Sequence, residues 1–264
     1  MQVTVQGVTK AYGSKRLFTE VNVAFSGGRR YGLTGPNGAG KSTFMKILAG
    51  DLEPDSGTIS RPDKTSVLRQ EQFAHAERRV LDVVLMGNRR LWAALQEKET
   101  LLQKADISDA EGERLGELEG TISEEDGYVA ESEAAALLTG LGIAEPQHER
   151  TMREIAGGLG LRVLLAQALF GKPEALLLDE PTNNLDLDSI RWLERFLQSY
   201  EGVLITISHD RHFLNEICTH VADIDYETII VYTGGYDDMV MAKSAVRSRV
   251  EQENAERDKK ITQL

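Results

Sequence analysis

The sequence is poor in cysteine, in long apolar runs and in positive charge, and each shortage excludes a class of protein. Cys218 is the single cysteine among 264 residues, so the chain has no internal disulfide and fits a reducing compartment. The longest apolar runs, at 175–178 and 203–207, are far shorter than the roughly 20 residues of a membrane-spanning helix. The N-terminal residues lack the basic and apolar parts of a signal peptide. We therefore expect a cytoplasmic protein in which Cys218 is a small buried apolar group.

The formal net charge of −12 argues against broad binding to nucleic-acid phosphates. This charge is unevenly distributed, because residues 88–140 contain 13 acidic and 5 basic side chains, whereas residues 243–264 contain 4 acidic and 6 basic ones. We expect these two segments to face different partners.

The most informative stretch is GPNGAGKST at 35–43. It matches the pattern of a phosphate-binding loop, in which glycines at fixed places are followed by lysine and serine. A short apolar strand precedes it, and apolar residues at helical spacing follow it. The backbone N–H groups and the helix N-terminus should receive a polyphosphate. The predicted nucleotide-binding residues are Gly35, Pro36, Asn37, Gly38, Ala39, Gly40, Lys41, Ser42 and Thr43.

Two carboxylates complete this predicted site. Asp179 and Glu180 follow the apolar run 176–178, which is typical of a buried parallel strand. Asp179 can hold hydrated Mg²⁺ together with the Ser42 hydroxyl, while Lys41 bridges the β- and γ-phosphates. Glu180 can polarise the attacking water.

The rest of the chain predicts a mixed α/β protein. Alternating apolar residues at 3–5 and 21–25 indicate a half-buried antiparallel sheet. Residues 91–133 predict two charged helices with a break at 106–109, and hence a projecting hairpin, although a solvated helix pair without a partner fits equally well. Further helices are expected at 80–86, 133–141, 161–170, 187–198, 211–218 and 237–264, and strands at 58–60, 65–68, 175–179, 203–208, 221–225 and 228–232.

Three motifs resemble the ATP-binding-cassette (ABC) ATPases, and in particular their soluble ABC-F branch. They are DEPTNNLD at 179–186, the glycine pair at 157–158 and SHDRHFL at 208–214. The resemblance implies an ABC-type P-loop NTPase cassette with an antiparallel β subdomain, a parallel core sheet and an α-helical subdomain that carries the hairpin arm. It assigns residues 1–236 to a first cassette, with the arm and its insert at about 88–140, and 237–264 to the start of an interdomain linker.

The resemblance also implies roles for individual residues. Tyr12 would stack on adenine, although a turn tyrosine on the surface is the plain alternative. Gln70 would sense Mg²⁺ and the γ-phosphate, and His209 would contact the γ-phosphate and the attacking water. Asp186 would cross to an opposing cassette. The implied metal ligands are Ser42, Gln70 and Asp179.

One motif departs from the family pattern. The usual Leu-Ser-Gly-Gly sequence, followed by Gln or Glu, is replaced by Ile155-Ala156-Gly157-Gly158-Leu159. This segment binds the γ-phosphate held by the opposing cassette in the family. Ala156 and Leu159 remove polar groups, while the backbone donors of the glycines remain, so we expect a weakened second site.

The implied reaction is hydrolysis of ATP with Mg²⁺, coupled to pairing with a second cassette absent from this chain or with another copy. The implied partner is the ribosome, through rRNA or tRNA at the exit site, with no membrane contact, and an isolated cassette should turn over slowly. An ATPase subunit of a membrane transporter is the alternative. A repair-type cassette would need long coiled coils or zinc cysteines, and a non-catalytic module is disfavoured because Glu180 and His209 are present.

Overall fold

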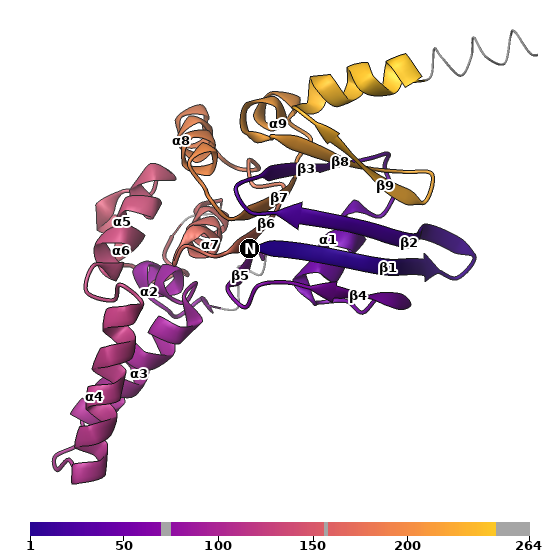
Figure 1. Cartoon of the computed structure of the whole chain (residues 1–264). Helices are drawn as coiled ribbons and strands as arrows, with labels where there is room; N and C mark the ends of the chain where they lie inside the picture. The colour runs from indigo at the N-terminus through magenta and orange to yellow at the C-terminus, as the bar shows by residue number, and fades with distance from the viewer. Residues whose placement is uncertain (70–74, 156–157, 247–264) are drawn as a thin grey trace, which may run out of the picture. The chain divides into compact units, whose positions relative to one another are not determined.

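The computed structural model describes residues 1–69, 75–155 and 158–246 (Figure 1). The chain divides into two compact units. The first unit comprises Met1–Pro62 and Glu201–Leu264, and the second comprises Asp63–Tyr200.

The first unit contains a three-stranded antiparallel sheet in the order β2-β1-β4. Its strands are β1 (Gln2–Tyr12), β2 (Lys15–Ser26) and β4 (Ser56–Ser60). Val3 and Val5 are buried while their neighbours in β1 are more exposed, as expected for a sheet with one face in the core. The predicted N-terminal antiparallel sheet is confirmed.

The same unit contains a set of mainly parallel strands. β3 (Arg30–Thr34) lies between β7 (Val203–Ile207) and β8 (His220–Asp225) and is parallel to both, and β9 (Thr228–Thr233) pairs antiparallel with β8. β7 is buried at every position, because parallel strands are covered on both faces. Within its described residues, the helices of this unit are α1 (Lys41–Ala49), α9 (Arg211–Ile217) and a helix at 236–246, drawn yellow in Figure 1.

Cys218 directly follows α9 and is buried. Its Sγ lies 3.0 Å from the position that a Cβ on Gly32 would take, so it packs closely against β3. Burial raises the pKa of the thiol to about 12, which keeps it protonated at neutral pH. Cys218 is therefore the small apolar packing group that its sequence context predicts.

The second unit pairs two parallel strands, β5 (Thr65–Val67) and β6 (Ala175–Asp179). Five of its helices are α2 (Val80–Leu85), α5 (Ala130–Gly140), α6 (Glu145–His148), α7 (Leu159–Leu169) and α8 (Leu187–Gln198). α2 and α7 are largely apolar and bury most of their side chains. Together the two units give the expected α/β class.

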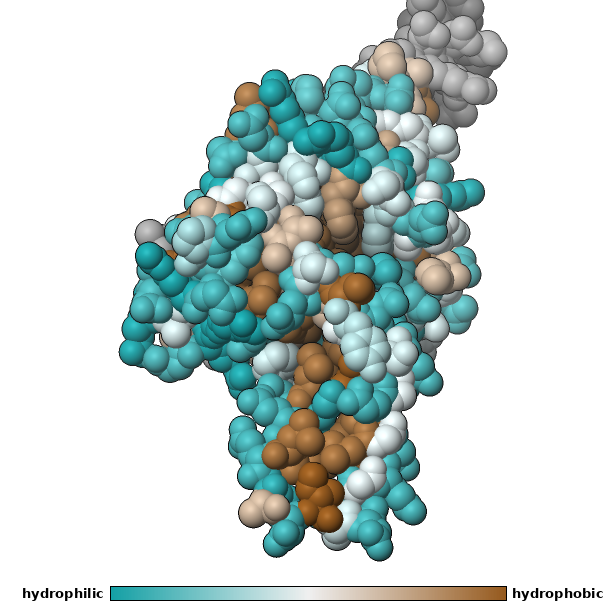
Figure 2. Space-filling view, turned by 90° about the vertical axis from the view of Figure 1, so that its left-hand side faces the viewer, coloured by the Kyte–Doolittle hydropathy of each residue, from teal (hydrophilic) through white to brown (hydrophobic). Residues whose placement is uncertain are grey.

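A helical hairpin projects from the second unit (Figure 1). It consists of α3 (Arg89–Leu102) and α4 (Asp109–Glu124). A thin apolar stripe that includes buried Leu91 and Leu118 holds the helices together, and Figure 2 shows apolar side chains along the arm flanked by hydrophilic ones. The predicted hairpin is confirmed. Its first helix starts two residues earlier than expected, because the Asn88 side chain accepts a hydrogen bond from Leu91 N and caps it.

In the described part of the chain, each helix is too short or too polar to cross a lipid bilayer.

Candidate nucleotide-binding site

The loop between β3 and α1 has a backbone that requires its glycines. Gly35, Gly38 and Gly40 have φ angles of 144°, 78° and 103°, which L side chains rarely adopt. At Gly35 a Cβ would also lie 2.5 Å from the carbonyl oxygen of Ile224 on β8. The loop conformation predicted from GPNGAGKST therefore depends on backbone angles that glycine adopts readily and other residues do not.

Lys41 extends back over this loop from the first position of α1. Its Nζ donates hydrogen bonds to the carbonyl oxygens of Gly35, at 2.8 Å, and of Pro36, at 3.2 Å. α1 has no acidic residue in its first turn, so the partial positive charge of the helix N-terminus is not offset there. Ser42 and Thr43 share this turn. An ammonium group and a helix N-terminus together form a site for a polyphosphate anion.

His209 lies on the same cavity as this loop. β3 and β7 are parallel and in register, with Tyr31 opposite Ile205, so the segments that follow them emerge at one edge of the sheet. The cavity has a volume of about 570 Å³ and is lined in part by Asn37, Lys41 and His209. The structure thus brings together the predicted phosphate-loop residues and the predicted switch histidine.

Tyr12 ends β1 and presents an open ring. Its side chain is 54% exposed, and Lys10 Nζ lies 5.7 Å from the ring centroid. Asp55 holds that ammonium at 2.7 Å. The aromatic face has room for the predicted stacking on a base.

Lys15 is a cation beside the loop that sequence reasoning missed. It pairs with Tyr12 across the β1–β2 turn, and its Nζ lies 3.2 Å from where a Cβ on Gly38 would be. The signal was available in principle, since a tight hairpin places residues 12 and 15 opposite each other. What the sequence does not contain is the approach of that hairpin to the phosphate loop.

In the second unit, the predicted acidic residues stand at the end of β6. Asp179 is the last residue of the strand, and Glu180 directly after it has a φ of 51°. A non-glycine residue in this left-handed region is strained, and such strain gathers at functional sites. Asn183 N donates to Glu180 O at 3.2 Å and closes the turn that follows. Carboxylate and hydroxyl oxygens, as in Asp179 and Ser42, are the donors that Mg²⁺ uses alongside phosphates.

The segment of the predicted signature motif lies against the turn that leads to α8. A Cβ on Gly158 would lie 3.3 Å from Asn184 Cβ, and Leu159 begins α7. Arg162, one turn further along, donates from Nε to Asn184 O at 3.0 Å and from Nη1 to Asp186 Oδ2 at 2.8 Å. Arg162 was also missed by sequence reasoning, although one arginine in an otherwise apolar helix was a usable signal.

Gln70, Ala156 and Gly157 lie outside the described residues. Their roles as Mg²⁺ sensor and as part of the signature motif therefore stay predictions from the resemblance. The same holds for residues 247–264 of the predicted linker.

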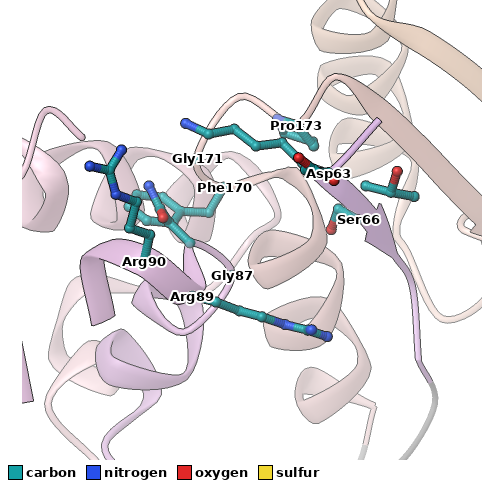
Figure 3. Close-up of a pocket in the computed structure, with 11 residues that line it drawn as sticks. Asp63, Ser66, Gly87, Arg89, Arg90, Phe170, Gly171 and Pro173 are labelled. Carbon is teal, nitrogen blue, oxygen red and sulfur yellow. The ribbon is translucent and has the colours of Figure 1, made fainter. Parts of the chain in front are cut away.

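A second cavity of about 300 Å³ lies within the second unit, near the base of the arm (Figure 3). Beside it, buried Glu125 accepts hydrogen bonds from Lys64, Asn88 and Arg90. Figure 3 shows Arg89 and Arg90 directed to different sides, so they do not converge on one ligand. We interpret this cluster as the point where the arm is attached to the rest of the second unit, because it joins the start of α3, the end of α4 and the residue before β5.

The fold and the phosphate loop define a P-loop nucleotide-binding cassette. The model of the family described as ABC transporter matches residues 18–183. The chain is 51% identical over 97% of its length to the probable ATP-binding protein YbiT of Escherichia coli O157:H7, of which it covers 49%. It is 34% identical over 89% of its length to ABC transporter F family member 4 of Arabidopsis thaliana, of which it covers 33%.

Among solved structures, the dimeric structure of MJ0796, a bacterial ABC transporter cassette, aligns with a TM-score of 0.63. That alignment covers 88% of this chain and 98% of the other at 17% identity, so it supports the fold alone. The chain belongs to the ABC transporter family of ATP-binding proteins, and its cassette is of the ABC-F type. It spans about half the length of the curated relatives that it matches.

Proposed function

We propose that this chain is the ATP-binding and ATP-hydrolysing cassette of a ribosome-associated translation factor. The proposed ATPase activity rests on one observation. Lys41, Asn37 and His209 line one cavity beside a glycine-rich loop whose positive φ angles suit phosphate binding. The ribosomal part rests on the ABC-F type of the cassette and on its projecting arm.

Binding of the nucleotide follows from the groups around this loop. Tyr12 stacks on adenine, and the loop N–H groups with the α1 N-terminus receive the phosphates. Lys41 exchanges its two carbonyl partners, Gly35 and Pro36, for β- and γ-phosphate oxygens. Ser42, Gln70 and Asp179 are the residues that would hold Mg²⁺, which neutralises charge on the phosphates when bound.

Each of the remaining predicted residues has one role in the proposed hydrolysis. Glu180 polarises the water that attacks the γ-phosphate. His209 donates a hydrogen bond to the γ-phosphate and fixes the water. The glycines of the signature segment and the α7 N-terminus act on ATP held by an opposing cassette, and Asp186 reaches across in the same assembly. The structural neighbour MJ0796 is described as dimeric, and we propose pairing of the same kind for this cassette.

The distribution of charge along the chain supports the ribosome as the proposed partner. The arm segment 88–140 is strongly acidic, and residues 243–264 carry a small positive excess. A basic segment suits rRNA or tRNA phosphates, while the acidic arm suits a different, basic surface of the ribosome. ATP binding brings two cassettes together, and hydrolysis releases them.

The test is ribosome co-sedimentation of the whole native protein carrying Glu180→Gln. Loss of this carboxylate should trap the ATP-bound state, so we expect co-pelleting with ATP that ADP abolishes. A Glu180→Gln, Lys41→Ala double variant is the matched control, because it should lose both ATP binding and pelleting. Demonstrated ATP binding without pelleting would contradict the ribosomal role. Copurification with a membrane protein would favour a transporter subunit.

A further inference from the structure

The phosphate loop is fastened at its base to strand β8. Thr34 is the last residue of β3 and directly precedes Gly35. Its Oγ1 donates a hydrogen bond of 2.9 Å to Asp223 Oδ1, and both residues are buried, with exposures of 8% and 3%. Gly35 itself lies too close to Ile224 O to carry a Cβ. The start of the loop is therefore positioned by Asp223 and its neighbour.

A buried carboxylate of this kind depends on a counter-charge, since an unpaired charge in the interior is costly. That counter-charge comes from the helix at 236–246. Lys243 Nζ lies 2.6 Å from Asp223 Oδ2 and 2.8 Å from Asp225 Oδ2. Burial lowers the pKa of Lys243, but the hydrogen bonds to the two carboxylates outweigh it and raise this pKa above its usual range, so the ammonium stays charged at physiological pH.

Lys243 and Lys41 line the same cavity. The ammonium of Lys243 is held by two carboxylates, whereas that of Lys41 is held by two neutral carbonyl oxygens. The attraction between opposite charges favours keeping Lys243 on Asp223 and Asp225 when a phosphate arrives. Lys243 is thus suited to position the loop and not to bind the nucleotide.

We propose that Lys243 and Asp223 are positioning residues that couple the helix at 236–246 to the phosphate loop through Thr34. Displacement of this helix removes the counter-charge from Asp223, and Asp223 then holds Thr34 less firmly. Coupling free energies act in both directions, so nucleotide binding also changes how firmly the helix is held. The inference rests on the proposed binding of ATP at this loop.

The test measures the affinity of a fluorescent nucleotide, mant-ATP, for the whole native protein. We expect Lys243→Met and Asp223→Asn each to weaken binding about tenfold, a value within the usual range of coupling energies. The double variant should bind like either single variant, because both remove one connection. Lys243→Arg should restore most of the affinity. Lys104→Met, at the arm, is the charge-matched control and should have no effect.

The direction in which Asp223→Asn changes the affinity for mant-ATP distinguishes a positioning role of Lys243 from direct contact with phosphate. If Lys243 bound phosphate itself, Asp223→Asn would free its ammonium and tighten mant-ATP binding, and that result would overturn the proposal. Unchanged affinity in Lys243→Met would overturn it too. Thr34→Val, which keeps the shape of the side chain and removes the hydroxyl, should weaken binding in the same direction as Asp223→Asn.

Amide hydrogen exchange measured without nucleotide tests the coupling independently of ATP binding. Amide hydrogen exchange of residues 35–40, referenced to that of buried β7 in the same protein, should be faster in Lys243→Met than in the wild type and the Lys104→Met control, with every protein measured far below its own melting temperature. Unchanged exchange would contradict the coupling even if ATP binds. If the wild-type protein failed to bind mant-ATP while the exchange difference appeared, the proposed function would be wrong and the coupling would stand.

Discussion

Arg162 on α7 and Asp186 before α8 form an ion pair, with Nη1 2.8 Å from Oδ2. The other carboxylate oxygen of Asp186 accepts a hydrogen bond from Ser189 N at 2.9 Å and caps α8. Both oxygens are thus engaged within this chain. If Asp186 reaches an opposing cassette, it does so by sharing or exchanging these partners, so Arg162 influences how readily it can reach across.

The first prediction concerns the protonation of Asp186. The Ser189 N–H, together with Arg162, lowers its pKa to about 2. In Arg162→Met the pKa should rise but stay below the usual value, because the Ser189 N–H remains. Carbon-13 NMR titration of the Asp186 carboxyl measures this shift. Arg114→Met on the arm should leave the Asp186 titration unchanged.

The sign for stability follows from that lowered pKa. A carboxylate with a lowered pKa stabilises the fold above the unfolded-state pKa of about 3.9 and loses this contribution as pH falls toward 2. Between these values the wild type should therefore lose stability more steeply than Asp186→Asn. Equal pH dependence of the two proteins in urea unfolding would contradict the assignment.

The second prediction concerns Lys15 as a ligand of the nucleotide phosphates. Its ammonium lies close to Gly38 and is exposed, so we expect Lys15→Met to weaken mant-ATP binding by about threefold to tenfold. Arg16→Met is the matched control, since successive residues of a strand point to opposite faces. An equal loss in both variants would indicate a general charge effect instead of a local contact.

The sequence predicted the parts of this molecule that local patterns determine. The loop at 35–43 follows from its glycines, the arm from helical spacing and a polar break, and β6 from an apolar run that ends in Asp179. Lys15, Arg162 and the Asp223–Lys243 pair escaped prediction for a common physical reason. Each acts on a residue that another element brings close. A hairpin turn or a lone arginine in an apolar helix can mark such a residue, but the sequence does not identify the partner that it contacts. α3 begins two residues before its predicted start, because the Asn88 side chain caps it.

The third prediction compares two glycines with positive φ angles. Gly35→Ala should destabilise the protein by more than about 2 kcal/mol and impair ATP binding, because strain adds to overlap with Ile224 O. Gly13→Ala should cost only about 1 kcal/mol, since nothing lies within 4 Å of its Cβ position. Urea unfolding measures both. Equal costs would mean that backbone strain, and not contact with β8, fixes Gly35.

The fourth prediction concerns three glycines inside α4. Gly112, Gly116 and Gly120 recur every fourth residue and therefore lie along one face of the helix, and nothing lies within 4 Å of their Cβ positions. A glycine within a helix costs roughly 0.5–1 kcal/mol relative to alanine. Replacing all three by alanine should therefore slow amide hydrogen exchange along α4.

Gly127 provides the control for the glycines of α4. Its Cβ position lies 2.5 Å from Ile122 Cγ2, so Gly127→Ala should destabilise the arm. If the triple alanine variant also exchanged faster than the wild type, the added methyl groups would be meeting other atoms, which contradicts the open face seen here. Slower exchange in the triple variant and faster exchange in Gly127→Ala would show that packing around each glycine, and not helix propensity alone, decides the stability of the arm.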